Sequence, residues 1–113
     1  MISKDEILKK SRAIIKNNYY IYALISNNEI VYIGQTSTLA MRLGQHISSN
    51  KVFDSWSVIE DLGSFINESD LNIKELQYIY TFKPKYNSQS KSLNFNKNKK
   101  NFLIKNIIKK SYA

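Results

Sequence analysis

The stretch from Tyr19 to Thr36, YYIYALISNNEIVYIGQT, decides the fold, because it holds two runs of β-branched and aromatic residues separated by polar ones. Such residues favour strands, and the two runs cover residues 19–25 and 29–34. The intervening SNNE is typical of a tight turn. The pattern therefore predicts a β-hairpin.

Tyrosine is frequent in this hairpin, which contains four of the chain's eight tyrosines. Tyr20 and Tyr22 lie two residues apart, so they share one face of their strand. Tyr32 is followed by Ile33 and Gly34, and a glycine there permits a positive φ or a close backbone approach. Tyrosine also packs well in half-buried sheets, so the hydroxyl groups alone do not establish a functional site.

The rest of the chain is predicted to contain helices and one more strand. The pattern indicates a helix within residues 1–17, a helix over 38–49, a strand over 53–61 and a helix over 69–82 that Pro84 ends. A chain of 113 residues with this order is predicted to be one α+β domain, with a small three-stranded antiparallel sheet and flanking helices.

The composition excludes several classes of protein. The chain has no cysteine and one histidine, which excludes disulfides, thiolate metal sites and zinc held by Cys and His. It has no apolar run long enough to span a membrane, and its first residues lack the apolar core of a signal peptide. We therefore expect a cytoplasmic protein without a membrane anchor.

The net charge of +8 is concentrated in the last quarter of the chain. Residues 1–87 carry ten Lys/Arg and nine Asp/Glu, whereas residues 88–113 carry seven Lys and no acid. Residues 89–113 are predicted to be a polar linker and a short basic helix over 102–110. The apolar stripe of this helix is Leu103, Ile104, Ile107 and Ile108. Such a tail most often binds nucleic acid and less often a membrane surface, although biased codon usage also produces Asn- and Lys-rich segments.

Two helices carry polar residues beside their apolar stripes. In the helix over 38–49, with Thr36 or Ser37 as its N-cap, Arg42 and His46 project from one face because they are four residues apart. Arginine offers a planar fork of donors and histidine titrates near neutral pH, so the pair suits a phosphate. A lone histidine in a small domain is nevertheless usually incidental.

The helix over 69–82 places Glu75 among apolar residues. When the helix is wound at about 100° per residue, Glu75 falls between Leu71, Ile79 and Phe82. A carboxylate in that position is costly unless it is paired or bound to a cation. The alternative is a carboxylate at the rim of the core that reaches solvent.

These residues together resemble the GIY-YIG nuclease domain over about residues 19–88. The first motif is represented by Tyr20-Ile21-Tyr22, in place of Gly-Ile-Tyr, and the second is intact as Tyr32-Ile33-Gly34. Arg42 and His46 follow Tyr32 by ten and fourteen residues, at the family's spacing. Glu75 matches the glutamate of the family's later helix, and Pro84–Asn87 match its Pro-x-Tyr-Asn.

The sequence departs from the family pattern at two positions. Tyr20 stands in place of the glycine, which suggests a packing role for this tyrosine. Gln35 follows the second motif where the DNA-repair excision nucleases of the family carry a lysine. The second departure favours a small stand-alone protein of the homing, phage or restriction-like branch.

The resemblance implies a metal-dependent DNA endonuclease that hydrolyses phosphodiester bonds. The catalytic residues that it implies are Tyr22, Tyr32, Arg42, His46, Glu75 and Asn87. Glu75 would bind Mg²⁺ or Mn²⁺, Arg42 would grip the phosphate, and either Tyr32 or His46 would be the general base. Tyr22 would orient the water or Tyr32. Asn87 would position the metal-binding helix or a phosphate.

The expected substrate is duplex DNA, with a homodimer or a specificity partner as a further possibility. The residues expected to bind substrate are Gly34, Gln35, Lys85, Lys97, Lys99, Lys100 and Lys105. The expected domains are residues 1–17, a helix packed on the nuclease domain, residues 18–88, the nuclease domain, and residues 89–113, a DNA-contacting extension.

Two alternatives to an enzyme follow from the same residues. One is a degenerate, non-catalytic DNA-binding module, although such a module is expected to have lost Arg42 or Glu75. The other is a basic adaptor or membrane-surface protein that uses the tail as an anchor. This last alternative leaves the constellation of Arg42, His46 and Glu75 unexplained.

Overall fold

A hairpin of two antiparallel strands forms the centre of the fold. The computed structural model describes residues 18–87 and 97–112, with the backbone alone over 97–102. The elements are β1 (Tyr20–Ser26), β2 (Glu29–Thr36), α2 (Leu39–Ile47), β3 (Ser55–Asp61), α3 (Glu68–Phe82) and α4 (Lys97–Lys109). The strands form one antiparallel sheet in the order β2-β1-β3. The predicted α+β fold is confirmed, while the helix predicted within residues 1–17 lies outside the described residues.

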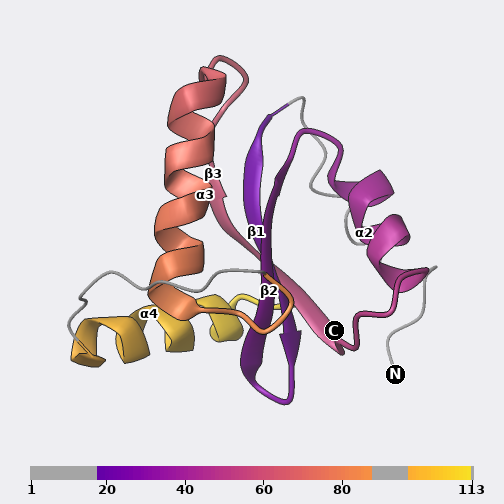
Figure 1. Ribbon diagram of the computed structural model, residues 1–113, viewed down its shortest axis with the longest axis vertical. Coiled ribbons are helices and arrows are strands. Elements are labelled where there is room, and N and C mark those ends of the chain that lie inside the picture. Colours follow the sequence, from indigo (N-terminus) through magenta and orange to yellow (C-terminus); the bar gives the residue numbers. More distant parts are fainter. Residues whose placement is uncertain (1–17, 88–96, 113) are drawn as a thin grey trace.

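The sheet is covered on both faces, with α2 on one side and α3 and α4 on the other (Figure 1). The central strand β1 is buried along almost its whole length, which explains its nearly unbroken run of apolar and aromatic residues. Tyr20, Tyr22 and Leu24 face α2. Ile21, Ala23 and Ile25 alternate with them and face the two longer helices.

The hairpin contains a tight turn and a bulge. Asn27 and Asn28 at the turn both have positive φ, as the turns that join right-twisted strands require. The register then pairs Leu24 with Tyr32 but Ile25 with Ile30, so it skips Val31. Val31 and Tyr32 consequently both pack on the α2 side of the sheet. The bulge thus aims the tyrosine ring of the second motif at α2.

The start of α2 differs from the sequence-based expectation. Its N-cap is Thr38, not Thr36 or Ser37. The Thr36 hydroxyl oxygen instead accepts a hydrogen bond at 2.9 Å from the backbone N–H of Thr38, the N-cap residue itself. At the other end, the hydroxyl of Ser49 donates to the His46 carbonyl at 2.6 Å, which satisfies a terminal carbonyl and ends the helix.

Both ends of α3 carry recognisable stop signals. The Asn67 side chain caps its first turn by accepting a hydrogen bond from the Asp70 backbone N–H at 2.8 Å. The helix ends at Phe82, because Lys83 adopts a left-handed conformation and Pro84 follows. The predicted role of Pro84 as the stop is confirmed.

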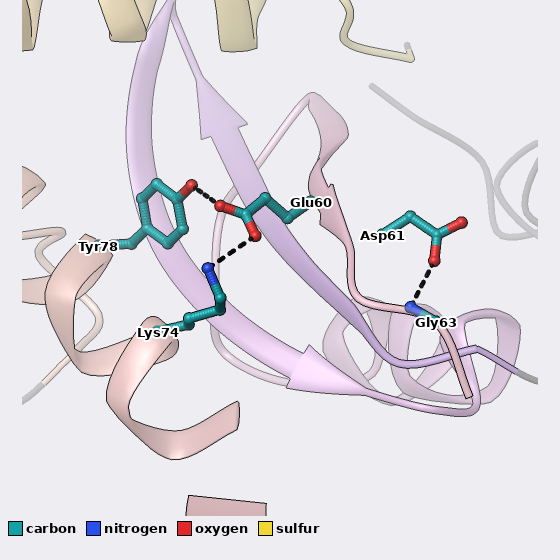
Figure 2. Close-up of polar contacts among 5 residues, drawn as sticks. All are labelled: Glu60, Asp61, Gly63, Lys74 and Tyr78. Carbon is teal, nitrogen blue, oxygen red and sulfur yellow. Dashed lines mark hydrogen bonds and ion pairs between the residues drawn. The ribbon is translucent and has the colours of Figure 1, made fainter. Parts of the chain in front are cut away.

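A polar contact joins α3 to the edge strand β3 (Figure 2). The Tyr78 hydroxyl donates a hydrogen bond to Glu60, whose second carboxylate oxygen lies 3.4 Å from the Lys74 ammonium group. Burial is the main cause that raises the pKa of Tyr78, and the adjacent Glu60 carboxylate adds to it. Tyr78 therefore stays protonated and acts as a donor in this clamp.

The C-terminal helix α4 belongs to the same hydrophobic core as α3. Ile107 is only 3% exposed, and the other residues of the predicted apolar stripe pack partly buried against the same cluster. Beyond the helix, Tyr112 exchanges two backbone hydrogen bonds with Trp56 and stacks on its ring with centroids 4.6 Å apart. Within residues 18–87 and 97–112, none of the helices is both long and apolar enough to cross a membrane.

Candidate active site

Three aromatic side chains predicted to act together lie side by side between the sheet and α2. The Tyr22 hydroxyl is 2.6 Å from Nε2 of His46. The Tyr32 and His46 rings are 4.8 Å apart at their centroids, and the Tyr22 and Tyr32 rings are 6.1 Å apart. The Tyr22 and Tyr32 side chains also influence one another electrostatically, because an ionised Tyr32 would raise the pKa of Tyr22. A hydrogen bond therefore joins Tyr22 to His46, and the Tyr32 ring lies against both side chains.

Gly34 makes room for the Tyr22 ring and its bond to His46. It lies inside β2, directly opposite Tyr22 in the register. A Cβ at this position would lie 2.6 Å from the Tyr22 hydroxyl oxygen and 2.7 Å from its Cζ, which is far inside van der Waals contact. The expected close approach is therefore present, and it comes from a side chain that crosses the backbone.

Arg42 stands at the exposed rim of the same cluster. Its positive charge favours the ionised forms of Tyr22, Tyr32 and Glu75 and disfavours protonation of His46. An effect on all four side chains indicates that the guanidinium group lies in their common neighbourhood. The structure thus brings Arg42, which α2 supplies, together with residues from both strands of the hairpin and from α3.

Glu75 reaches the site from the other side of the sheet. Burial is the main cause that raises the pKa of its half-buried carboxyl group. The polar side chain and backbone of the neighbouring Gln35, followed by the charge of Arg42, act in the opposite direction. The Gln35 amide nitrogen also donates to the Asn72 side-chain oxygen at 2.5 Å. Gln35 therefore lies beside the Glu75 carboxylate, and its expected role in binding substrate stays a prediction.

The titration of the aromatic cluster is shifted in opposite directions for tyrosine and histidine. Burial, followed by the charge of neighbouring groups, raises the pKa of both Tyr22 and Tyr32 above the ordinary tyrosine value. Burial, followed by the charges of Lys51 and Arg42, lowers the pKa of His46 to about 4. At neutral pH both tyrosines are protonated and His46 is neutral, so His46 has a lone pair available.

Asn87 occupies a different place from the one expected. Its side-chain oxygen accepts a hydrogen bond from the Ile33 backbone N–H, and its side-chain nitrogen donates to the Ile33 carbonyl, both at 2.9 Å. The Tyr86 backbone N–H donates to the Val31 carbonyl at 2.9 Å. Because β2 is an edge strand, these bonds pair its outer edge. Asn87 thus holds the strand that carries Tyr32, where we had expected it to hold the helix or a phosphate.

The lysines predicted to bind substrate are scattered. Lys85 lies beside β2, with its ammonium group 4.9 Å from the centroid of the Tyr86 ring. Lys105 is exposed on α4, on the opposite side of the sheet from α2. The side chains of Lys97, Lys99 and Lys100 lie outside the described residues.

Sequence reasoning missed one cation of the site. The Lys51 ammonium group lies 5.0 Å from the centroid of the Tyr32 ring and contributes to the low pKa of His46. Lys51 sits in the irregular connection between α2 and β3, outside every motif, so no sequence pattern identifies it. The position of this cation over the Tyr32 ring depends on how that connection folds back over β2.

The family model of the GIY-YIG catalytic domain matches residues 18–87. None of the curated proteins matches the chain. Solved structures similar to it include three point mutants of the GIY-YIG N-terminal endonuclease domain of UvrC from Thermotoga maritima, each bound to its catalytic divalent cation. They align with 79% of this chain and 100% of their own, with TM-scores of 0.54 and identities of 21%, 21% and 22%.

The solved structures establish the fold, and the family model establishes the family. The prediction of a GIY-YIG endonuclease domain is confirmed, whereas the choice of the stand-alone branch stays a prediction. The chain belongs to the GIY-YIG family of catalytic domains.

Proposed function

We propose that the protein is a metal-dependent DNA endonuclease of the stand-alone, homing, phage or restriction-like branch of this family. One observation carries the proposal: side chains from the hairpin, α2 and α3 converge on one place, although they are far apart in the sequence. A buried cluster of polar groups costs stability unless the groups are fully paired. Proteins keep such clusters mainly at functional sites. The converging residues are Tyr22, Tyr32, Arg42, His46 and Glu75.

The donors present at the site fit a hard divalent cation. Glu75 offers a half-buried carboxylate, and Asn72 on the same helix offers a side-chain oxygen that accepts a hydrogen bond from the Gln35 amide nitrogen. In residues 18–87 and 97–112 there is no group of three or more His, Cys, Asp and Glu suited to a metal. Mg²⁺ or Mn²⁺ suits such a place, because these ions keep several waters and share their coordination with a substrate phosphate.

When bound, the metal would neutralise phosphate charge and lower the pKa of a nearby water. Glu75 would hold the ion, and Gln35 would hold Glu75. Arg42, at the exposed rim, would grip the phosphate with its fork of donors and stabilise the added negative charge of the transition state.

The proton of the attacking water has a path through the aromatic cluster. Tyr32, at the outer end, would take this proton while passing its own to Tyr22, and Tyr22 would pass its hydroxyl proton to Nε2 of His46. This path needs no ionised tyrosine beforehand, which the raised tyrosine pKa values disfavour. Tyr32 and His46, between which the sequence left the choice open, would therefore act as the two ends of one relay.

His46 makes folding stability depend on pH. Its pKa is about 4 in the folded protein, against about 6.5 for free histidine. Between these values the unfolded chain takes up a proton that the folded protein does not, so stability falls as the pH drops from about 6.5 to about 4. Urea unfolding across this range is expected to show a smaller loss for His46→Gln, which does not titrate. Parallel curves for the two proteins would contradict the assignment.

A plasmid-cleavage assay tests the proposed function. We expect nicked or linear plasmid with Mg²⁺ or Mn²⁺ and none with EDTA. Gel-shift binding of the same plasmid without cleavage under all metal conditions would instead identify the non-catalytic DNA-binding module. Absence of both cleavage and binding would overturn the proposal.

Several finer statements are part of the same proposal. The cytoplasmic location, a homodimer or specificity partner, and DNA contacts by Lys97, Lys99, Lys100 and Lys105 stay predictions. Deleting residues 89–113 is a poor test of the basic tail, because α4 buries Ile107 in the core. Substituting Lys105 alone removes charge without exposing that core.

A further inference from the structure

Two lysines stand on tyrosine rings beside the candidate active site. The Lys51 ammonium group lies 5.0 Å from the centroid of Tyr32, and that of Lys85 lies 4.9 Å from the centroid of Tyr86. We propose that this pair, here called the lysine shelf, binds backbone phosphates of DNA and leads the strand away from the active site along the outer edge of β2. The proposal rests on the proposed nuclease function and adds the surface that receives the substrate.

The two halves of the lysine shelf are tied to one another. The Tyr86 hydroxyl oxygen accepts a hydrogen bond from the Val52 backbone N–H at 2.9 Å, which joins the segment of Lys85 to that of Lys51. The Tyr86 backbone N–H bonds the bulged residue Val31 of β2 at 2.9 Å. Both lysines therefore rise from backbone that is held against the sheet, so binding a phosphate orders little more of the chain.

The ammonium groups of the shelf are available to a polyanion. Among the described side chains the one ion pair joins Lys74 to Glu60, so neither shelf lysine is neutralised by a carboxylate. Lys85 is exposed, and it lines a cavity of about 360 Å³ together with Lys83 and one acid, Glu29. A ring beneath each ammonium group orients it without removing its charge.

The shelf continues the positive charge of the active site. Arg42 is exposed and close enough to Tyr32 to favour its ionised form, and Lys51 stands on the same ring. Three cations thus follow one another from α2 to the segment after α3. When Arg42 holds one phosphate of a DNA strand, the neighbouring phosphates of that strand can bind the two lysines of the shelf.

Salt-dependent DNA binding tests the shelf in protein that also carries Glu75→Ala, so that the DNA is not cleaved. Fluorescence anisotropy with a labelled duplex gives the dissociation constant at a series of salt concentrations. Lys51→Gln with Lys85→Gln is expected to reduce the log–log salt slope by about 1.8, because each lost phosphate contact removes about 0.9. Lys51→Arg with Lys85→Arg keeps both charges and is expected to keep the slope.

Lys74→Gln is the control for losing one positive charge away from the shelf, and it is compared with Lys51→Gln alone, whose slope is expected to fall by about 0.9. Lys74 pairs with Glu60 on β3, at the opposite edge of the sheet from β2 (Figure 2), so its loss is expected to leave the slope unchanged. An equal drop in slope for Lys74→Gln would show a net-charge effect and overturn the shelf. An unchanged slope in the double Gln variant would also overturn the shelf, provided that the parent protein binds DNA. If the parent protein does not bind DNA at all, the proposed function itself fails.

Discussion

Glu75→Ala is expected to abolish DNA cleavage while leaving DNA binding in place. The loss should reach roughly 10²–10³-fold, the size of effect seen when one preorganised electrostatic group is removed from an active site. Binding is expected to persist, because Arg42 and the lysine shelf contact phosphate without this carboxylate. The measurements are plasmid cleavage with Mg²⁺ and fluorescence anisotropy with the labelled duplex that is used for the salt series. Titration with Mn²⁺ should show in parallel that metal binding is lost.

Glu68→Ala is the matched control for this change. Glu68 is an exposed acid in the first turn of α3, the helix that also carries Glu75. Its removal costs a helix-terminus interaction of about 0.3–1 kcal/mol and touches no residue of the site. Retained cleavage by purified Glu75→Ala protein would sink the metal assignment, whereas equal losses in both variants would point to a general effect on α3.

Gly34→Ala is expected to lower both stability and activity. The added Cβ would overlap the Tyr22 ring, with its hydroxyl oxygen at 2.6 Å, so the ring must move away from His46. Overpacking of this kind typically costs about 1–3 kcal/mol of unfolding free energy. Moving the Tyr22 hydroxyl also breaks its hydrogen bond to Nε2 of His46, on which the proposed proton path depends. Urea unfolding and cleavage rate measure the two effects separately.

A double-mutant cycle shows whether the effect of Gly34→Ala comes from this one contact. In a Tyr22→Leu background, the shorter side chain no longer crosses the glycine, so Gly34→Ala is expected to cost much less unfolding free energy than in the parent protein. Additive costs would mean that Gly34 is needed for a reason other than the Tyr22 ring.

Much of the fold followed from local patterns. The hairpin, the helix containing Arg42 and His46, and the stop at Pro84 each depend on neighbouring residues, whose spacing reports the period of a strand or a helix. The predicted end of α2 was less accurate. Ser49 satisfies the carbonyl of His46, so the helix stops earlier than its apolar spacing indicates. Capping bonds of this kind compete with periodicity at helix ends.

The site was predicted in its members but not in its contacts. Motif spacing identified Tyr22, Tyr32, Arg42, His46 and Glu75, and the structure brings these residues together. Motif spacing did not show that Gln35 lies beside Glu75, because this proximity joins an edge strand to a helix packed against it. Lys51 escaped notice because an irregular segment has no period from which a direction can be inferred.

The sequence by itself determined the type and order of the elements, the tyrosine motifs and the helix positions of Arg42 and Glu75, because these depend on short-range periodicity and residue chemistry. Tertiary structure alone decided which groups meet. The bulge at Val31 turns Tyr32 toward His46, Tyr22 crosses Gly34, and Asn87 bonds the backbone of β2. These contacts join residues distant in the chain, and their geometry depends on register and on how each segment folds back. No local pattern records either of these.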